Sequence, residues 1–289
     1  MDSAAGAPEG ERVRGALLEL LDLCFPPRCL ACDGAPPWRG PSGRADAPGG
    51  EGLCRGCHRG LPDPAARCIA CGRRVGPREV APGSARGPLR LASGCLRCVG
   101  PLAAADPMAW RGDGSARRRR ALSGVVAAWS YGGVPRDLVV GLKFQTRLAA
   151  VRPLARGLAG ALRRAGIPGD LLVPVPLSRR RRRRRGYDQA ALLTAAVGRR
   201  LALACDRRAL VRRRHTPPQT GLPRSLRRRG PRGAFRAVRR RVEGRCVILV
   251  DDVLTSGATA KACALALRRA GAASVVAAVA CRAERAART

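Results

Sequence analysis

Residues 247–259 read VILVDDVLTSGAT, and this stretch decides the fold. Its apolar start predicts a buried strand at 246–250, which leads into two adjacent carboxylates, Asp251 and Asp252. A turn of small and hydroxyl-bearing residues follows and opens a helix at 258–270. Such a turn presents free backbone N–H groups and the positive end of a helix dipole, which together hold a phosphate. The stretch therefore predicts an anion-binding turn at the carboxyl end of a sheet strand.

The predicted anion-binding turn consists of Thr255, Ser256, Gly257, Ala258 and Thr259. The hydroxyl groups add donors, and the glycine lets the backbone approach the anion closely. Two carboxylates that faced the same phosphate would repel it. We therefore expect Asp251 and Asp252 to bind other groups of the ligand, such as sugar hydroxyls or a metal ion. The alternative is a polar strand end followed by an N-capped helix, but the whole string favours a ligand site.

Residues 122–289 alternate short apolar runs with helical periodicity, which is typical of a parallel sheet covered by helices. The pattern predicts strands at 125–131, 171–175, 246–250 and 274–280. It predicts helices at 135–144, 148–165, 189–203 and 258–270. We therefore expect an α/β fold with Rossmann-like winding in this part of the chain.

The N-terminal third carries eight of the chain's 13 cysteines in four C-x-x-C pairs. The pairs are Cys29/Cys32, Cys54/Cys57, Cys68/Cys71 and Cys95/Cys98. Each pair can present two sulfurs to one ion, and two pairs complete a tetrahedral zinc site. The first pair is separated from the second by 21 residues, and the third from the fourth by 23 residues. Sequential pairing therefore predicts two similar zinc ribbons. The two other pairings remain open, and redox-active or disulfide pairs are the alternative.

The predicted zinc ions are structural, because a site with four protein ligands leaves no open position for a substrate. The stretches 34–52 and 76–94 are rich in Gly and Pro and hold too few hydrophobic residues for a core, so they need the metal. His58, beside Cys57, is expected to be a loop residue. The cysteines outside the pairs and in apolar surroundings are expected to fill the core. They are Cys205, Cys246, Cys263 and Cys281.

The chain is expected to comprise an N-terminal helix and double zinc ribbon at 1–101, a basic linker at 102–121, and the α/β domain at 122–289. The helix is predicted at 11–23. No run of 18 uncharged apolar residues occurs, so no membrane span is expected. The acidic N-terminus does not resemble a signal peptide, and paired cysteines without one favour the cytoplasm. The oligomeric state is open at this point.

The formal net charge of +36 is concentrated in one region. Residues 178–241 carry 23 arginines and two acidic residues, a net charge of +21. Such a surface attracts nucleic acid, acidic lipid or phosphorylated metabolites, although 3% aromatic residues argue against base stacking. The seven arginines at 179–185 are interpreted either as a loop that contacts an anion or as a solvated loop enriched by codon bias.

The string at 247–259 resembles the phosphoribosyl-pyrophosphate (PRPP) motif of type I phosphoribosyltransferases. The rest of the chain resembles the ComF family of competence-associated, phosphoribosyltransferase-like proteins. The family-like segments are FPPRC at 25–29, LKF at 142–144, VPVP at 173–176, RGYDQ at 185–189, Thr216, Gln219, Leu222, Arg227 and GAF at 233–235. Two positions depart from the family pattern, because Asp188 and Gly230 stand where asparagine is common.

The resemblance implies transfer of a phosphoribosyl group from PRPP–Mg²⁺ to an acceptor that it does not name. Asp251 and Asp252 would bind the ribose hydroxyls and steady an oxocarbenium-like transition state, and 255–259 would hold the 5′-phosphate. The segment 216–235 would close over the site and exclude water. The implied pyrophosphate and lid residues are Lys143, Arg185, Gly186, Gln189, Gln219 and Arg227. Two other functions remain, a nucleic-acid-binding accessory protein of DNA uptake and a PRPP-sensing regulator without catalysis.

Overall fold

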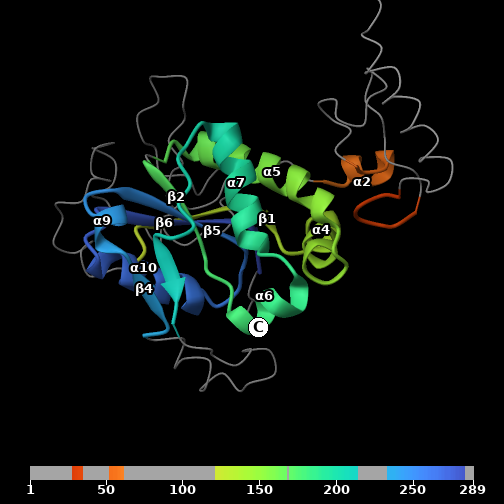
Figure 1. The fold of residues 1–289 in the computed structure, drawn as a ribbon. Helices are drawn as coiled ribbons and strands as arrows, with labels where there is room; N and C mark the ends of the chain where they lie inside the picture. The colour runs from red at the N-terminus through yellow and green to blue at the C-terminus, as the bar shows by residue number, and fades with distance from the viewer. Residues whose placement is uncertain (1–27, 35–51, 62–120, 168, 214–232, 284–289) are drawn as a thin grey trace, which may run out of the picture. The chain divides into compact units, whose positions relative to one another are not determined.

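The computed structural model describes residues 28–34, 52–61, 121–167, 169–213 and 233–283 (Figure 1). The chain divides into two units, with the boundary in the sequence between Gly60 and Leu61, and each is described by itself. The helix predicted at 11–23 and the linker predicted at 102–121 lie outside the described residues, so both stay predictions. Within the described ranges, no helix has the length and apolarity needed to span a bilayer.

A four-stranded parallel sheet, in the order β1-β6-β5-β2, forms the centre of the second unit (Figure 1). Its strands are β1 (Gly124–Ser130), β2 (Leu171–Pro174), β5 (Cys246–Leu254) and β6 (Ser274–Arg282). Valine and alanine dominate these strands, and most of their residues are buried, as expected for a parallel sheet that is covered on both faces. The predicted α/β fold is confirmed.

Helices cover both faces of this sheet (Figure 1). The longer ones are α4 (Gly133–Phe144), α5 (Val151–Ala165, preceded by the 3₁₀ turn Leu148–Ala150), α7 (Gln189–Leu201) and α10 (Ala258–Arg269). On one face, α5 packs on β1 and β6 while α7 packs on β5 and β2. Helix α5 lies so close to β1 that a Cβ atom on Gly157 would lie 1.9 Å from the Trp129 ring.

The opposite face of the sheet is covered by α10 and a two-stranded antiparallel sheet. This small sheet pairs β3 (Leu210–Arg212) with β4 (Phe235–Ala237), and the short helix α9 (Arg239–Val242) follows it. Its apolar residues, such as Leu210 and Phe235, join the core that α10 forms with the sheet. The pattern of the sequence did not predict these three short elements.

Two predicted elements differ from the structure in ways that affect the site. Strand β5 continues to Leu254, so the two aspartates lie within the strand, because β6 runs beside it and pairs Val279 with Asp251. The arginine run, expected as a loop, forms the helix α6 (Arg179–Arg185). Ser178 caps the start of this helix by accepting from the Arg181 N–H, and Gly186 ends it with a left-handed φ of 77°.

The cysteines predicted to fill the core are buried in three of four cases. Cys246, Cys263 and Cys281 are buried. The prediction is wrong for Cys205, which is exposed. Its backbone bridges Leu172 at the edge of the sheet, and its sulfur lies against α7, where it donates to the Thr194 carbonyl at 3.5 Å, outside the core between the layers.

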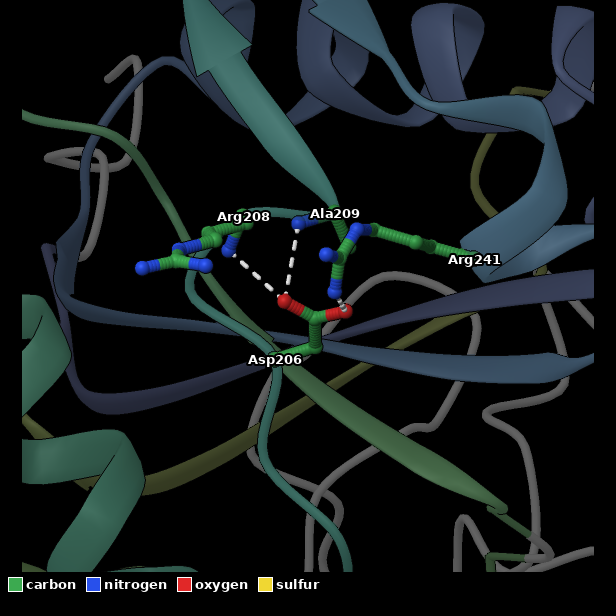
Figure 2. Close-up of polar contacts among 4 residues, drawn as sticks. All are labelled: Asp206, Arg208, Ala209 and Arg241. Carbon is green, nitrogen blue, oxygen red and sulfur yellow. Dashed lines mark hydrogen bonds and ion pairs between the residues drawn. The ribbon is translucent and has the colours of Figure 1, made fainter.

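Asp206 joins the segment before β3 to the helix that follows β4 (Figure 2). Its Oδ1 accepts from the N–H groups of Arg208, at 2.7 Å, and Ala209, at 3.1 Å. Its Oδ2 lies 2.7 Å from an Arg241 guanidinium nitrogen. Partial burial raises the pKa of Asp206, but the Arg241 contact and the backbone donors outweigh burial and lower it below its usual value. This carboxylate therefore ties together the two ends of the β3–β4 unit.

We expect Asp206→Ala to lower the free energy of unfolding at pH 7 by about 2–3 kcal/mol, because hydrogen bonds to a charged group are lost. Asp206→Asn, which can still accept from the two N–H groups, should lose less. Because the pKa of Asp206 is lowered in the folded chain, its stabilisation is present above pH 4 or so and is lost as the pH falls through the folded pKa. Urea unfolding at pH 7 and pH 3 measures both effects, and an equal loss at both pH values would contradict the assignment.

Candidate functional site

The candidate site lies where β5 and β2 end. These neighbouring strands are followed by helices that cover opposite faces of the sheet, α10 after β5 and α7 after β2. Open α/β sheets bind ligands in the crevice at such a point. Strand β2 ends where Pro174 pairs with Val250, and β5 continues beyond it. Asp251 and Asp252 therefore lie just past the carboxyl end of the neighbouring strand β2, although they are still within β5.

Asp252 is the more deeply buried member of the acid pair, with a side chain only 4% exposed, and Asp251 beside it is partly buried. Its Oδ1 lies 2.7 Å from the Lys143 Nζ, which comes from the last turn of α4. Its Oδ2 is buried and has no hydrogen-bond partner among the described residues. Its backbone N–H donates to the Asp251 Oδ1 at 2.9 Å. The site therefore holds a buried carboxylate with one satisfied oxygen and one free acceptor.

Asp251 differs from its neighbour in its ionisation. Burial of the carboxyl group, and next the charge of Asp252, raise the pKa of Asp251 to about 8, although Lys143 and the Asp252 N–H act in the opposite direction. Near pH 7 the pair therefore holds a proton that two isolated carboxylates would have lost. A ligand that supplies donors or positive charge to this pair would favour loss of that proton.

The predicted turn follows β5 and opens α10 as the sequence indicates. Thr255 and Ser256 are exposed, and Gly257 has a left-handed φ of 74°, which favours glycine. The Ser256 Oγ accepts from the Ala258 N–H at 3.4 Å, but no side chain of the N-cap residue, Gly257, caps the helix. The first turn of α10 carries no acidic residue. This helix start is therefore suited to an anion.

A second wall of the site comes from α4 and the junction between α6 and α7. The Arg185 guanidinium lies over the exposed Phe144 ring, 5.3 Å from its centroid. Burial lowers the pKa of Arg185, while the charge of Asp252 raises it, so the two side chains attract each other electrostatically. The Tyr187 hydroxyl donates to the Leu142 carbonyl, which fixes the α6–α7 junction to α4.

The first residues of α7 complete this wall. Asp188 accepts from the Ala191 N–H at 3.1 Å and so caps the helix, a role that asparagine shares. Gln189 is buried, and its Oε1 has no partner among the residues that the structure describes. The departure from the family pattern at position 188 thus keeps the helix cap.

The structure brings most of the predicted site residues to one edge of the sheet. Asp251 and Asp252 are joined there by Lys143, through the ion pair, and by Arg185, through the charge of Asp252. Gln219 and Arg227 lie outside the described residues. Sequence reasoning missed Phe144 and Tyr187, although both lie in segments, LKF and RGYDQ, that place an aromatic residue within two positions of a cation.

The first unit holds a separate cluster of four cysteines, and their sulfur atoms all lie within 4.8 Å of one another. The cluster consists of Cys29, Cys32, Cys54 and Cys57, which confirms sequential pairing for the first two C-x-x-C pairs. The short helix α2 (Arg55–Arg59) begins after Cys54, whose sulfur accepts from the Cys57 N–H at 3.3 Å. His58 is not part of the cluster.

The environment of the four sulfurs fits a bound cation. Burial, and next the sulfurs of Cys32 and Cys54, raise the pKa of Cys57, so the four thiols cannot all lose their protons without a positive ion. Four thiolates in this arrangement are typical of structural zinc. Cys68, Cys71, Cys95 and Cys98 lie outside the described residues, and a second zinc site there stays a prediction.

We expect the purified chain to contain two zinc ions and Cys54→Ser to contain one fewer, because three cysteines hold zinc poorly. Zinc released by a chelator can be measured against protein concentration. Cys205→Ser, which removes an exposed thiol outside the cluster, should leave the zinc content unchanged. A wild-type chain without zinc would contradict the assignment.

Comparison with known proteins adds relatives to this geometry. No model of a known protein family matches the chain. The chain is 39% identical over 143 residues to the DNA utilization protein YhgH of Escherichia coli O157:H7, an alignment that covers 48% of this chain and 63% of that protein. It is 37% identical over 141 residues to competence protein F of Haemophilus influenzae, covering 46% and 62% respectively. The chain thus spans less than two thirds of the length of these relatives.

Among solved structures, glutamine PRPP amidotransferase from B. subtilis matches with a TM-score of 0.32 and 23% identity. The match covers 45% of this chain and 25% of that chain. At this score the likeness carries no argument, and the fold rests on the sheet and helices described above. One of the sequence relatives, by contrast, bears the competence name that the motifs predicted. The chain is similar to competence protein F and to DNA utilization protein YhgH, which confirms its resemblance to the competence-associated proteins.

Proposed function

We propose that the chain binds PRPP–Mg²⁺ and transfers its phosphoribosyl group to an acceptor. The observation that carries the proposal is the Asp252 Oδ2, a buried acceptor without a partner among the described residues. A buried polar atom left unsatisfied costs about 1–3 kcal/mol, and more when it is charged. The hydroxyl groups of a ribose would donate to this oxygen and to Asp251, so a sugar phosphate suits the site.

The other parts of the ligand find matching groups around the acid pair. The start of α10, at Thr255, Ser256, Gly257, Ala258 and Thr259, would hold the 5′-phosphate. Lys143 and Arg185 would face the pyrophosphate, supported by the backbone at Gly186 and by Gln189. Gln219 and Arg227 would act from the lid that the sequence predicts.

The proposed reaction breaks the bond between C1 of the ribose and the pyrophosphate oxygen, which leaves with the electron pair. The lone pair of the acceptor forms the new bond to C1, and the acceptor loses a proton. Asp251 and Asp252 would stabilise the positive charge that develops on the sugar, because preorganised charges act strongly in a buried site. Mg²⁺, when bound with PRPP, would neutralise the negative charge of the pyrophosphate.

Calorimetry with PRPP and Mg²⁺ tests the proposal, and the expected result is saturable binding of one PRPP per chain. A screen of nucleobases and amines for pyrophosphate release then separates an enzyme from a regulator that only senses PRPP. Absence of PRPP binding would overturn the proposal. Binding with no pyrophosphate release by any acceptor would favour the PRPP-sensing regulator.

A second candidate function is that of an accessory protein that handles nucleic acid in the cytoplasm. It is favoured by the net charge of +21 over residues 178–241, which exceeds what one PRPP could balance. The printed names of the relatives, DNA utilization protein and competence protein, agree with such a role. The four-thiolate cluster suits a reducing compartment. The two functions are compatible, because the acid pair and the arginines are different groups.

A further inference from the structure

The arginine helix α6 has two faces that differ in their contacts. Arg181 and Arg185, four residues apart, lie on one side and are partly buried. The Arg185 guanidinium lies over the Phe144 ring and interacts electrostatically with Asp252. The pKa of Arg212 is lowered first by its own burial and next by the charge of Arg181. Arg185 therefore belongs to the side of the helix that faces the candidate site, and Arg181 lies one turn before it on the same side.

The other five arginines of α6 form its outer face. They are Arg179, Arg180, Arg182, Arg183 and Arg184, and all five are exposed. Among the described residues, none of them forms an ion pair with a carboxylate, whereas Arg136, Arg239 and Arg241 do. The outer face thus presents five positive charges that the described part of the chain leaves uncompensated.

A shallow, open groove of about 330 Å³ follows part of this outer face. It is lined by Arg179, Arg182, Arg183 and Gly186, which are spaced as one stripe along a helix. Apart from the neighbouring residues in the chain, no described heavy atom lies within 4 Å of the position that a Cβ atom on Gly186 would take, so the described residues leave the backbone open at this end of the groove. An anionic chain could lie along the stripe without displacing any described side chain.

The outer face is unfavourable for α6 in isolation. Arginines three and four residues apart repel one another, and arginines in the first turn oppose the helix dipole. No residue of α6 is buried, so packing of the helix contributes little. Its conformation depends on the Ser178 cap, the Gly186 terminus and the contact between Arg185 and Phe144. A bound polyanion would relieve the repulsion and stabilise the helix.

We propose that the outer face of α6 is a docking surface for the sugar-phosphate backbone of a nucleic acid, formed by arginines other than Arg181 and Arg185 of the inner face, which serves the PRPP site. This inference rests on the second candidate function and assigns that function to a specific surface of the chain. A seven-residue helix is about 10 Å long, and phosphates follow one strand of DNA every ~3.4 Å along its axis, so the face spans about three phosphates. The scarcity of aromatic residues, at 3%, favours contacts with the backbone over stacking with bases.

Salt-dependent DNA binding of the full chain tests the proposal through two matched triple variants. The first, Arg179→Gln with Arg182→Gln and Arg183→Gln, removes three charges from the groove. The second, Arg199→Gln with Arg207→Gln and Arg245→Gln, removes three exposed charges elsewhere in the same unit. Glutamine keeps a high helix propensity, and thermal unfolding verifies that both variants are folded. Fluorescence anisotropy with labelled duplex and single-stranded DNA gives the slope of log affinity against log salt.

For duplex DNA, the groove variant is expected to make the slope of log affinity against log salt shallower by about 3, one unit for each lost phosphate contact. The change should be smaller for single strands. The control variant should change the slope by less than about one unit. Equal changes in both variants would overturn the proposal, as would a wild-type chain that binds vesicles of anionic lipid but no DNA.

The same variants separate this inference from the proposed PRPP site. The groove variant should bind PRPP–Mg²⁺ in calorimetry as the wild type does, because Arg181 and Arg185 are unchanged. A wild type that binds DNA through the groove but binds no PRPP would refute only the enzymatic proposal. A groove variant that loses PRPP affinity while its DNA slope is unchanged would refute the division of α6 into two faces.

Discussion

Replacing both Asp251 and Asp252 with asparagine is expected to abolish detectable PRPP binding while the fold persists. The change keeps the shape of both side chains and removes the negative charge of the pair, together with one acceptor oxygen from each residue. Hydrogen bonds to a charged group contribute about 1.5–3 kcal/mol each, so the loss of two such acceptors weakens binding on the order of 10²–10⁴-fold. Calorimetry with PRPP–Mg²⁺ measures the loss. Unchanged affinity in the double variant would refute the placement of the ribose.

Asp137→Asn provides a matched control for this double variant. Asp137 lies on α4, as Lys143 does, and its side chain is 40% exposed beside Arg136. The substitution makes the same chemical change in the same unit, but at a side chain that is much more exposed than that of Asp252. It should leave PRPP affinity within about twofold of the wild type, because exposed ion pairs contribute little. A similar loss in the control would mean that net charge, and not the buried pair, determines binding.

The pH dependence of stability checks Asp251 independently of any ligand. Its pKa is raised to about 8 in the folded chain from an ordinary value of 3.8, first by burial and then by Asp252. Between these values the folded chain keeps a proton that the unfolded chain has lost. The free energy of unfolding therefore falls as the pH rises from about 4 to about 8. Asp251→Asn should remove this fall, and urea unfolding at pH 5 and pH 8 would detect it if it remained.

The turn from Thr255 to Thr259 could be predicted from the sequence because every signal for it is local. An apolar strand, a glycine with positive φ and a helix that starts with small residues are contiguous in the chain. The first cysteine cluster was predictable for the same reason, since its ligand pairs have a regular spacing. In both cases the chemistry is encoded within a few neighbouring residues.

Helix α6 could not be predicted because its stabilising contacts are not in its own sequence. Seven like charges have no apolar periodicity and repel one another, which indicates a loop. The contact that fixes the end of the helix joins Arg185 to Phe144, which comes from α4. The ion pair between Lys143 and Asp252 is equally non-local, because it depends on how α4 and β5 meet in the folded sheet. Such contacts follow from topology and not from any pattern in the sequence.

Lys143→Met is expected to lower the free energy of unfolding by about 3 kcal/mol or more, the range for breaking a buried ion pair by removing one partner. The loss of stability is expected because the Asp252 side chain is only 4% exposed and its Oδ1 forms an ion pair with the Lys143 Nζ, at 2.7 Å. Lys143 is 20% exposed, so the methionine keeps most of its packing while the carboxylate loses its counter-charge. Urea unfolding at pH 7 measures the loss.

The double variant Lys143→Met with Asp252→Asn distinguishes a lost charge from damaged packing. If the buried charge of Asp252 causes the instability, neutralising it should recover most of the stability, and a double-mutant cycle should give a coupling of about 1–3 kcal/mol. Asp252→Asn alone should cost less than Lys143→Met, because Lys143 can reach water and the aspartate cannot. If the two losses simply add, the pair makes no net contribution to the fold. Lys143 would then be held beside Asp252 without stabilising the protein, at the position where the pyrophosphate is proposed to bind.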